Sequence, residues 1–228
     1  MRWYGKLLVG VATLFFAAQS GCIVVSLSPW FDKKDVVLDK RLEGHWQDTD
    51  GHARFEVKRG KVQLWDDEIE GYLVTRYDCP EEKPSKPMAA VLGDIGKTRY
   101  LMVTTAPEIE PGPWFAASLH LIFKVDFGDK TLTLVGVNPD KIEEELGKHR
   151  FGLDFVCFDD GAVEPPKPGG DPCPGGMMLF TGSSSSLRSF LAHNGHGDTF
   201  FSKMGSYTRL KEPKCVPKKK VKEEKVNP

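Results

Sequence analysis

The chain has 228 residues, with 31 lysines and arginines against 32 aspartates and glutamates, and its formal net charge at pH 7 is −1. A charge balance this close to neutrality argues against a nucleic acid as the main partner, because phosphate recognition requires a strongly basic surface. The length fits one domain with terminal extensions, or at most two small domains.

The first 22 residues have the layout of an export signal. Arg2 and Lys6 give a positive start, an apolar run covers residues 7–18, and small residues lead to Cys22. The apolar run is about 12 residues long, whereas a helix that spans a bilayer needs about 20. We therefore interpret residues 1–21 as a signal peptide that is removed on export, and not as a permanent membrane span.

Ser20-Gly21-Cys22 resembles the lipobox of bacterial lipoproteins. In that family the signal is cut before the cysteine, and both its thiol and the new amino terminus receive fatty acyl chains such as palmitate. The resemblance implies anchoring to a membrane through lipidated Cys22. Gln19 departs from the aliphatic residue usual in the family, and the alternative is ordinary secretion with cleavage after Ser20. Ile23, in place of the aspartate that retains many lipoproteins at the inner membrane, favours the outer membrane of the cell envelope.

Residues 22–38 form an apolar-rich leader, which we expect to lie partly against a β-rich domain over residues 39–210. Near the start of that domain, Gly44 and Trp46 form a Gly-x-Trp motif. The motif is similar to the opening of lipocalin-like barrels, in which the tryptophan closes the barrel floor and the glycine lets chains pass closely. The alternative is that Trp46 is an ordinary core aromatic.

Short segments with alternating polarity follow. Residues 53–58 and 61–65 alternate on both sides of Arg59-Gly60, which predicts a hairpin with a two-residue turn. Residues 119–127 and 131–137 flank Gly128-Asp129-Lys130 and give the strongest hairpin pattern of the chain. Further strands are predicted over residues 71–77, 88–92, 100–105, 151–158, 177–181, 200–201 and 207–210.

Two short helices are predicted between these strands. Asn138 and Pro139 begin one helix over residues 138–147, and Gly147 ends it. Serines 183–186 cap the other, which ends at Asn194-Gly195. The fold class predicted is mainly β (α+β), an antiparallel barrel or sandwich of which a lipocalin-like barrel is one form. Residues 211–228 are rich in lysine and form a basic tail that we expect to be disordered.

The chain has five cysteines, of which Cys22 belongs to the lipobox. The even number of remaining cysteines in an exported chain suggests two disulfides. Cys157 and Cys173 flank a loop rich in proline and glycine, and we expect them to pair, which leaves Cys79 for Cys215. The sequence leaves all three connectivities open, and none of these cysteines forms a metal-type Cys-x-x-Cys pair.

No segment predicts a catalytic or metal site. Residues 181–184 do not match the Gly-x-Ser-x-Gly elbow of hydrolases. His193, His196 and Asp198 have metal-ligand chemistry, but a helix stop separates the two histidines and leaves no rigid support. We interpret His120 as a strand residue with one hydrogen bond. We interpret the carboxylates at 66–68 and 159–160 as solvated turns, and the lysines at 218–222 as a solubilising tail that could also touch anionic lipid. We therefore expect a protein that is not an enzyme and has no cofactor.

Two functions remain. The first, which the Gly-x-Trp motif and the many strands favour, is a lipid-anchored, non-catalytic module that binds an apolar or amphipathic ligand. It requires an interior cavity of about 300 Å³ or more. The second is a structural or interaction lipoprotein that presents loops and the basic tail to envelope proteins. It requires an interior filled by side chains and a sizeable exposed apolar patch.

Overall fold

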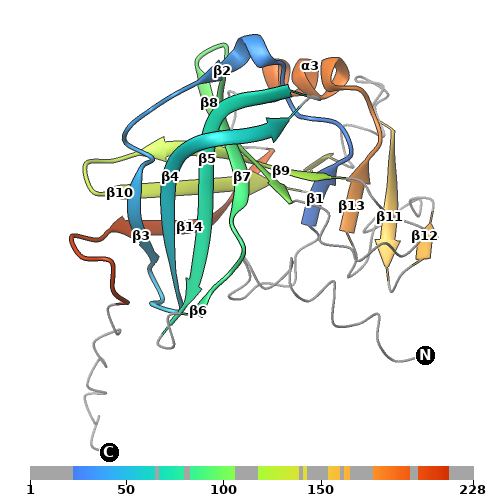
Figure 1. Cartoon of the computed structure of the whole chain (residues 1–228). Coiled ribbons are helices and arrows are strands. Elements are labelled where there is room, and N and C mark those ends of the chain that lie inside the picture. The colour runs from blue at the N-terminus through green and yellow to red at the C-terminus, as the bar shows by residue number, and fades with distance from the viewer. Residues whose placement is uncertain are drawn as a thin grey trace, which may run out of the picture.

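The structure, a computed structural model, describes residues 23–64, 67–79, 83–105, 118–138, 141–142, 154–159, 162–164, 177–195 and 200–215. Within them, eight antiparallel strands close into a barrel (Figure 1). In ring order they are β3 (Gly44–Asp48), β4 (Ala53–Leu64), β5 (Asp67–Asp78), β7 (Met88–Ile95), β8 (Thr98–Thr105), β9 (Leu119–Phe127), β10 (Thr131–Val137) and β14 (Phe201–Arg209), which returns to β3. The predicted mainly β fold is confirmed, and its form is a barrel.

A second set of strands extends the sheet beyond β9. It comprises β1 (Ile23–Ser26), β13 (Met177–Phe180), β11 (Phe155–Asp159) and β12 (Ala162–Glu164), in that order from β9. β1 pairs antiparallel with the first half of β9 and parallel with β13, whereas the second half of β9 pairs with β10. Two further short strands pair with barrel strands, β2 (Val36–Val37) with β7 and β6 (Lys83–Pro84) with β5. The expected leader thus contributes two strands to the sheet, the first of which begins at Ile23.

The inside of the barrel holds one cluster of buried side chains to which all eight strands contribute. Its members, one from each strand in ring order, include Trp46, Phe55, Tyr72, Leu92, Leu101, Phe123, Leu132 and Tyr207. Phe55 and Tyr207 meet edge to face across the interior, with ring centroids 5.5 Å apart. Alternate residues of each strand point to the same face, and this period explains the alternating polarity of the sequence.

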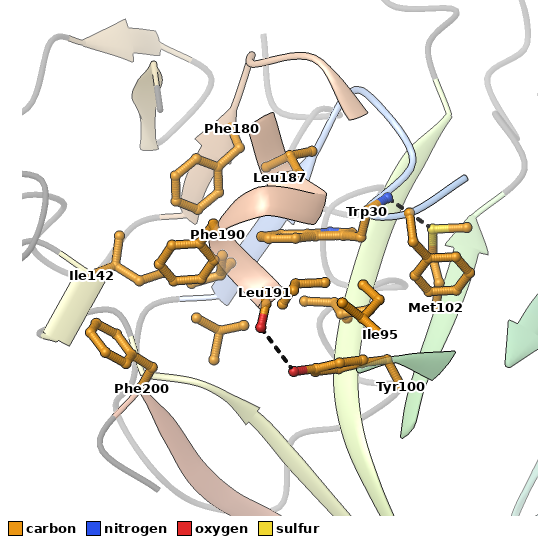
Figure 2. Packing of buried hydrophobic residues seen from close by; sticks show 14 of the residues in the cluster. Trp30, Ile95, Tyr100, Met102, Ile142, Phe180, Leu187, Phe190, Leu191 and Phe200 are labelled. Atoms are coloured by element: carbon orange, nitrogen blue, oxygen red, sulfur yellow. Dashed lines mark hydrogen bonds between the residues drawn. The ribbon is translucent and has the colours of Figure 1, made fainter. Parts of the chain in front are cut away.

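A second cluster of buried side chains lies on the outer face of β7, β8 and β9 (Figure 2). There the helix α3 (Ser184–Asn194) and a segment with Trp30 and Phe31, both fully buried, cover the barrel wall. The Trp30 indole nitrogen donates to the His120 carbonyl oxygen at 3.0 Å. The Phe31 ring lies on Gly93, where a Cβ atom would come within 2.6 Å of it. The leader therefore supplies part of a core.

The hairpin predicted around Arg59-Gly60 is wrong, because β4 runs without a turn from Ala53 to Leu64. It pairs residue by residue with β5, with Gly60 opposite Gly71. The buried face changes at this point: Phe55 and Val57 belong to the interior cluster, but Val62 and Leu64 belong to the outer cluster. A Cβ atom on Gly71 would lie 2.7 Å from the Ala90 carbonyl oxygen, so the missing side chain lets β5 cross β7 closely. This exchange of buried face produced the pattern of two separate strands.

The predicted helix after the serine run is confirmed as α3. Ser183 caps it by accepting a hydrogen bond from the Ser186 amide at 3.3 Å. Of the helix predicted over residues 138–147, Lys141 and Ile142 are helical, and the Ile142 amide donates to the Asn138 carbonyl oxygen at 3.2 Å. The remainder of that prediction lies largely outside the described residues.

Gly195 ends α3, but not because it needs a left-handed backbone. Its φ is −68°, which any residue adopts, but a Cβ atom there would lie 1.6 Å from the Tyr100 hydroxyl oxygen. We expect Gly195→Ala to reduce the free energy of unfolding by about 1–3 kcal/mol, the usual cost of overpacking. Urea unfolding measures this loss. Adding Tyr100→Phe should recover part of it, because that change removes the clashing oxygen, and an equally stable Gly195→Ala protein would contradict the packing.

The disulfide predicted between Cys79 and Cys215 is confirmed. It joins the end of β5 to the chain that follows β14, across a sequence separation of 136. Cys157, in β11, is also disulfide-bonded. Cys173, its predicted partner, lies outside the described residues, as do residues 216–228 of the predicted tail.

Candidate functional site

The predicted lipid-attachment residue, Cys22, lies outside the described residues together with residues 1–21. Ile23, the next residue, is already the first residue of β1. Among the described helices, none has the length and apolar character needed to cross a membrane.

The other charged groups singled out in the sequence do not converge on one site. The His193 Nδ1 atom lies 2.8 Å from the Ser189 carbonyl oxygen, while His196 and Asp198 lie outside the described residues. Asp67 and Glu68 belong to β5 and not to a turn, and they pair with Lys33 and Lys61. Asp159 ends β11, while residues 66, 160 and 218–222 lie outside the described residues. In the described part of the chain, no group of three or more potential metal-ligating side chains comes together.

His120 lies in the wall between the barrel and the extension, with 4% of its surface exposed. Its Nδ1 atom is 2.9 Å from the hydroxyl oxygen of Thr104, its cross-strand neighbour on β8, and this is the side-chain hydrogen bond that the sequence predicted. Burial lowers the pKa of His120 to about 4, which keeps the ring neutral at pH 7. The nearby Ser26 hydroxyl donates to the Ser28 carbonyl oxygen at 2.6 Å, and not to the imidazole. This contact does not provide the serine–base pair that nucleophilic catalysis needs.

We expect acid to destabilise the fold through His120. The unfolded imidazole has a pKa near 6.5 and the folded one about 4, so between these values the unfolded chain binds more protons. Stability should fall as the pH drops through this window, by about 3 kcal/mol in total. The midpoint of urea unfolding at pH 7 and pH 4 measures the loss. His120→Asn keeps a group that can bond Thr104 and should remove most of the pH dependence, and an unchanged loss in that variant would contradict the assignment.

One end of the barrel is closed by residues 38–43, which we call the end segment. Leu42 is buried in the interior cluster, and its carbonyl oxygen accepts from the Trp46 indole nitrogen at 2.8 Å. Gly44 has φ +126°, a conformation that L side chains rarely adopt. The Arg209 guanidinium lies 4.9 Å from the centre of the Trp46 ring and donates to the carbonyl oxygens of Arg41 and Glu43. Trp46 thus lies at a closed end of the barrel.

Asp39 fastens the end segment to the barrel. Its carboxylate accepts hydrogen bonds from Arg41, 2.6 Å at the shortest, and from Arg99 on β8. The hydrogen bond from the Arg41 side chain is the main reason why the pKa of Asp39 falls to about 2. The Asp39 amide donates at 2.6 Å to the hydroxyl of Tyr72, a member of the interior cluster. These contacts span the barrel from β5 to β8.

A group of polar side chains lies on the outer face of β3, β4 and β5. This outer polar face consists of His45, Arg54, Glu56, Lys58 and Tyr77. Arg54 is only 4% exposed, and its guanidinium stacks on Tyr77, 3.8 Å from the ring centre, and contacts the His45 Nδ1 atom at 3.2 Å. The Glu56 carboxylate accepts from Tyr77 at 3.1 Å and pairs with Lys58 at 3.0 Å.

The pKa values of His45 and Glu56 on this face are shifted because both side chains are partly buried. Desolvation lowers the pKa of His45, which leaves its ring neutral and its Nδ1 atom free to accept from Arg54. Burial raises the pKa of Glu56, but the hydrogen bonds from Lys58 and Tyr77 outweigh it, and the pKa is lowered overall. The Nε atom of Arg54 is buried and has no hydrogen-bond partner in the part of the chain that the structure describes. Sequence reasoning missed this face, because its members come from three strands and form no local motif.

Comparisons with known proteins find no matching family model, no matching curated protein and no matching solved structure.

Proposed function

We propose that the protein is a lipid-anchored, non-catalytic module of the bacterial cell envelope that acts through its outer surface, as an interaction lipoprotein. The observation that carries this choice is the cluster of large side chains inside the barrel, with Trp46, Tyr72 and Phe123 no more than 3% exposed. A barrel whose interior is occupied by its own side chains presents its recognition chemistry on the outside.

The carrier function, in which an apolar or amphipathic ligand lies inside the barrel, has less support. It would need a cavity of about 300 Å³ or more. The interior cluster draws side chains from every strand, and Leu42 adds a further side chain at the closed end. A ligand in that space would have to displace these side chains.

Among the described residues, the large hydrophobic side chains that are exposed are Leu27, Leu38 and Leu73, so the surface that we propose for recognition is not the apolar patch expected of an interaction lipoprotein. We propose the outer polar face instead. The buried Arg54 guanidinium holds the Tyr77 ring and the neutral His45 ring, and the Glu56 carboxylate and the exposed Lys58 complete the face, so it offers both donors and acceptors. Tyrosine is among the residue types over-represented at the energetic centres of protein interfaces. An envelope protein is therefore the class of partner that we propose, and the outer membrane is the proposed site of anchoring.

Two measurements test the proposal. Intact mass spectrometry of the protein isolated from host membranes should show fatty-acyl mass, which Cys22→Ala should abolish; an unmodified mature mass would overturn the lipid anchor. A photo-crosslinking residue in place of Lys58, whose side chain is 69% exposed, should capture an envelope protein in the host. The matched control is the same residue at Thr131, an exposed position on β10. Native mass spectrometry that finds a small molecule retained by the gently purified protein would instead support the carrier.

A further inference from the structure

The proposed lipid anchor has no linker between it and the folded sheet. Cys22 is followed directly by β1, and Cα atoms of adjacent residues are 3.8 Å apart. Ile23 is already in register with Met177 on β13. The place where the acyl chains would leave the protein is therefore fixed to within one residue of a strand.

β1 is held firmly at this position. It has a neighbour on each side, with Val25 opposite Leu121 on β9 and opposite Leu179 on β13. Val24 is 7% exposed and Val25 is 1% exposed, so the side chains on both faces of the strand are buried. The chain leaves Ile23 as part of a sheet and cannot extend away from it without unpairing β1.

A different surface lies on the side of the barrel opposite β1 and β9. β1 is attached to β9, and β4 lies four strands from β9 in either direction around the ring. The outer face of β4 carries Arg54, Glu56 and Lys58 of the outer polar face. The strand bearing most of this face is thus diametrically opposite the strand next to the anchor.

We infer that the protein lies directly on the bilayer, with the surface around the start of β1 against the lipid headgroups and the outer polar face turned away from the membrane. This inference rests on the proposed lipid anchor at Cys22. It assigns the bilayer as the partner of the β9–β1 side and leaves the β3–β4–β5 side open to proteins of the same compartment.

A pair of labelled variants tests this orientation. Asp126→Cys places a fluorophore on β9 and Lys58→Cys places one on β4, and both residues are exposed and charged. The unsubstituted protein measures background labelling of the native cysteines. The lipidated proteins are incorporated into vesicles of phosphatidylethanolamine and phosphatidylglycerol that contain a nitroxide headgroup quencher. We expect the label at residue 126 to be quenched several-fold more strongly than the label at residue 58.

A linker insertion provides the matched control. About ten glycine and serine residues between Cys22 and Ile23 would span about 17 Å on average, which should release the domain and remove most of the difference. Equal quenching of both labels in the lipidated protein without the insertion would overturn the orientation while leaving the anchor intact. Absence of acyl mass in the same samples would overturn the anchor and, with it, the orientation. Lipidated proteins whose difference in quenching persists after the insertion would show that the short connection does not set the orientation, which also overturns the inference.

Discussion

A protein that begins at Lys33 is expected to lose its cooperative unfolding transition. The truncation removes β1, which leaves the first half of β9 and all of β13 with a neighbour on one side only, and it removes Trp30 and Phe31. Both aromatic side chains are 0% exposed, and deletion of one such side chain costs about 3–5 kcal/mol. Two such losses are comparable with the whole stability of a typical domain, about 5–15 kcal/mol.

Urea unfolding followed by circular dichroism checks this result, with a protein that begins at Ile23 as the reference. Single substitutions separate the aromatic contribution from that of the strand: Trp30→Ala and Phe31→Ala should each lower the unfolding midpoint strongly. The matched control is Leu38→Ala, at a residue that is 41% exposed, which should change the midpoint little. A protein starting at Lys33 that unfolds at the reference midpoint would show that the leader does not belong to the core.

Trp46→Ala is expected to be the most damaging single substitution in the barrel interior, with a loss of about 3–5 kcal/mol. The indole is 3% exposed, it donates to the Leu42 carbonyl oxygen, and it lies under the Arg209 guanidinium. The substitution therefore leaves a cavity, an unpaired carbonyl group and a guanidinium without its aromatic surface. Chemical denaturation of the variant measures the loss.

A double-mutant cycle of Trp46→Ala and Arg209→Ala measures how much of this loss comes from the contact between the two side chains. Arg209→Ala should cost about 1–2 kcal/mol, because it removes donors to the carbonyl oxygens of Arg41 and Glu43. The two losses should be less than additive, since the residues share one contact. Strict additivity would mean that the stacking of Arg209 on Trp46 contributes nothing.

Much of the barrel could be predicted from local patterns. The strands Leu119–Phe127 and Thr131–Val137 were predicted with the same bounds as the structure has, because a polar turn separates two clear alternations. The error at Arg59-Gly60 has a physical cause in the exchange of buried face along β4. A shift in the alternation of buried and exposed residues has two possible causes, and the sequence does not distinguish them. Either the chain turns at that point, or the strand continues and buries its other face.

Contacts between distant segments account for what the sequence did not predict. The hydrogen bond of His120 could be anticipated, since a histidine between leucines in a strand has a cross-strand neighbour. The contact between Arg209 and Trp46 could not, because nothing near either residue indicates the other. The sequence predicted that a helix ends at Gly195, but it did not indicate that the packing of Tyr100 requires a glycine there. This requirement depends on the packing of α3 on β8, which the local sequence does not indicate.

The division of β9 between two neighbours has a mechanical consequence. A pull on the chain at Ile23 acts along β1, whose hydrogen bonds to β9 and β13 lie across the direction of the force, so they are loaded together in shear and not one after another. The same β9 backbone continues into its pairing with β10, which carries the load around the closed wall. Tension applied at the amino terminus is therefore shared by the whole barrel, and the strand beside the anchor becomes a point of high resistance to extraction.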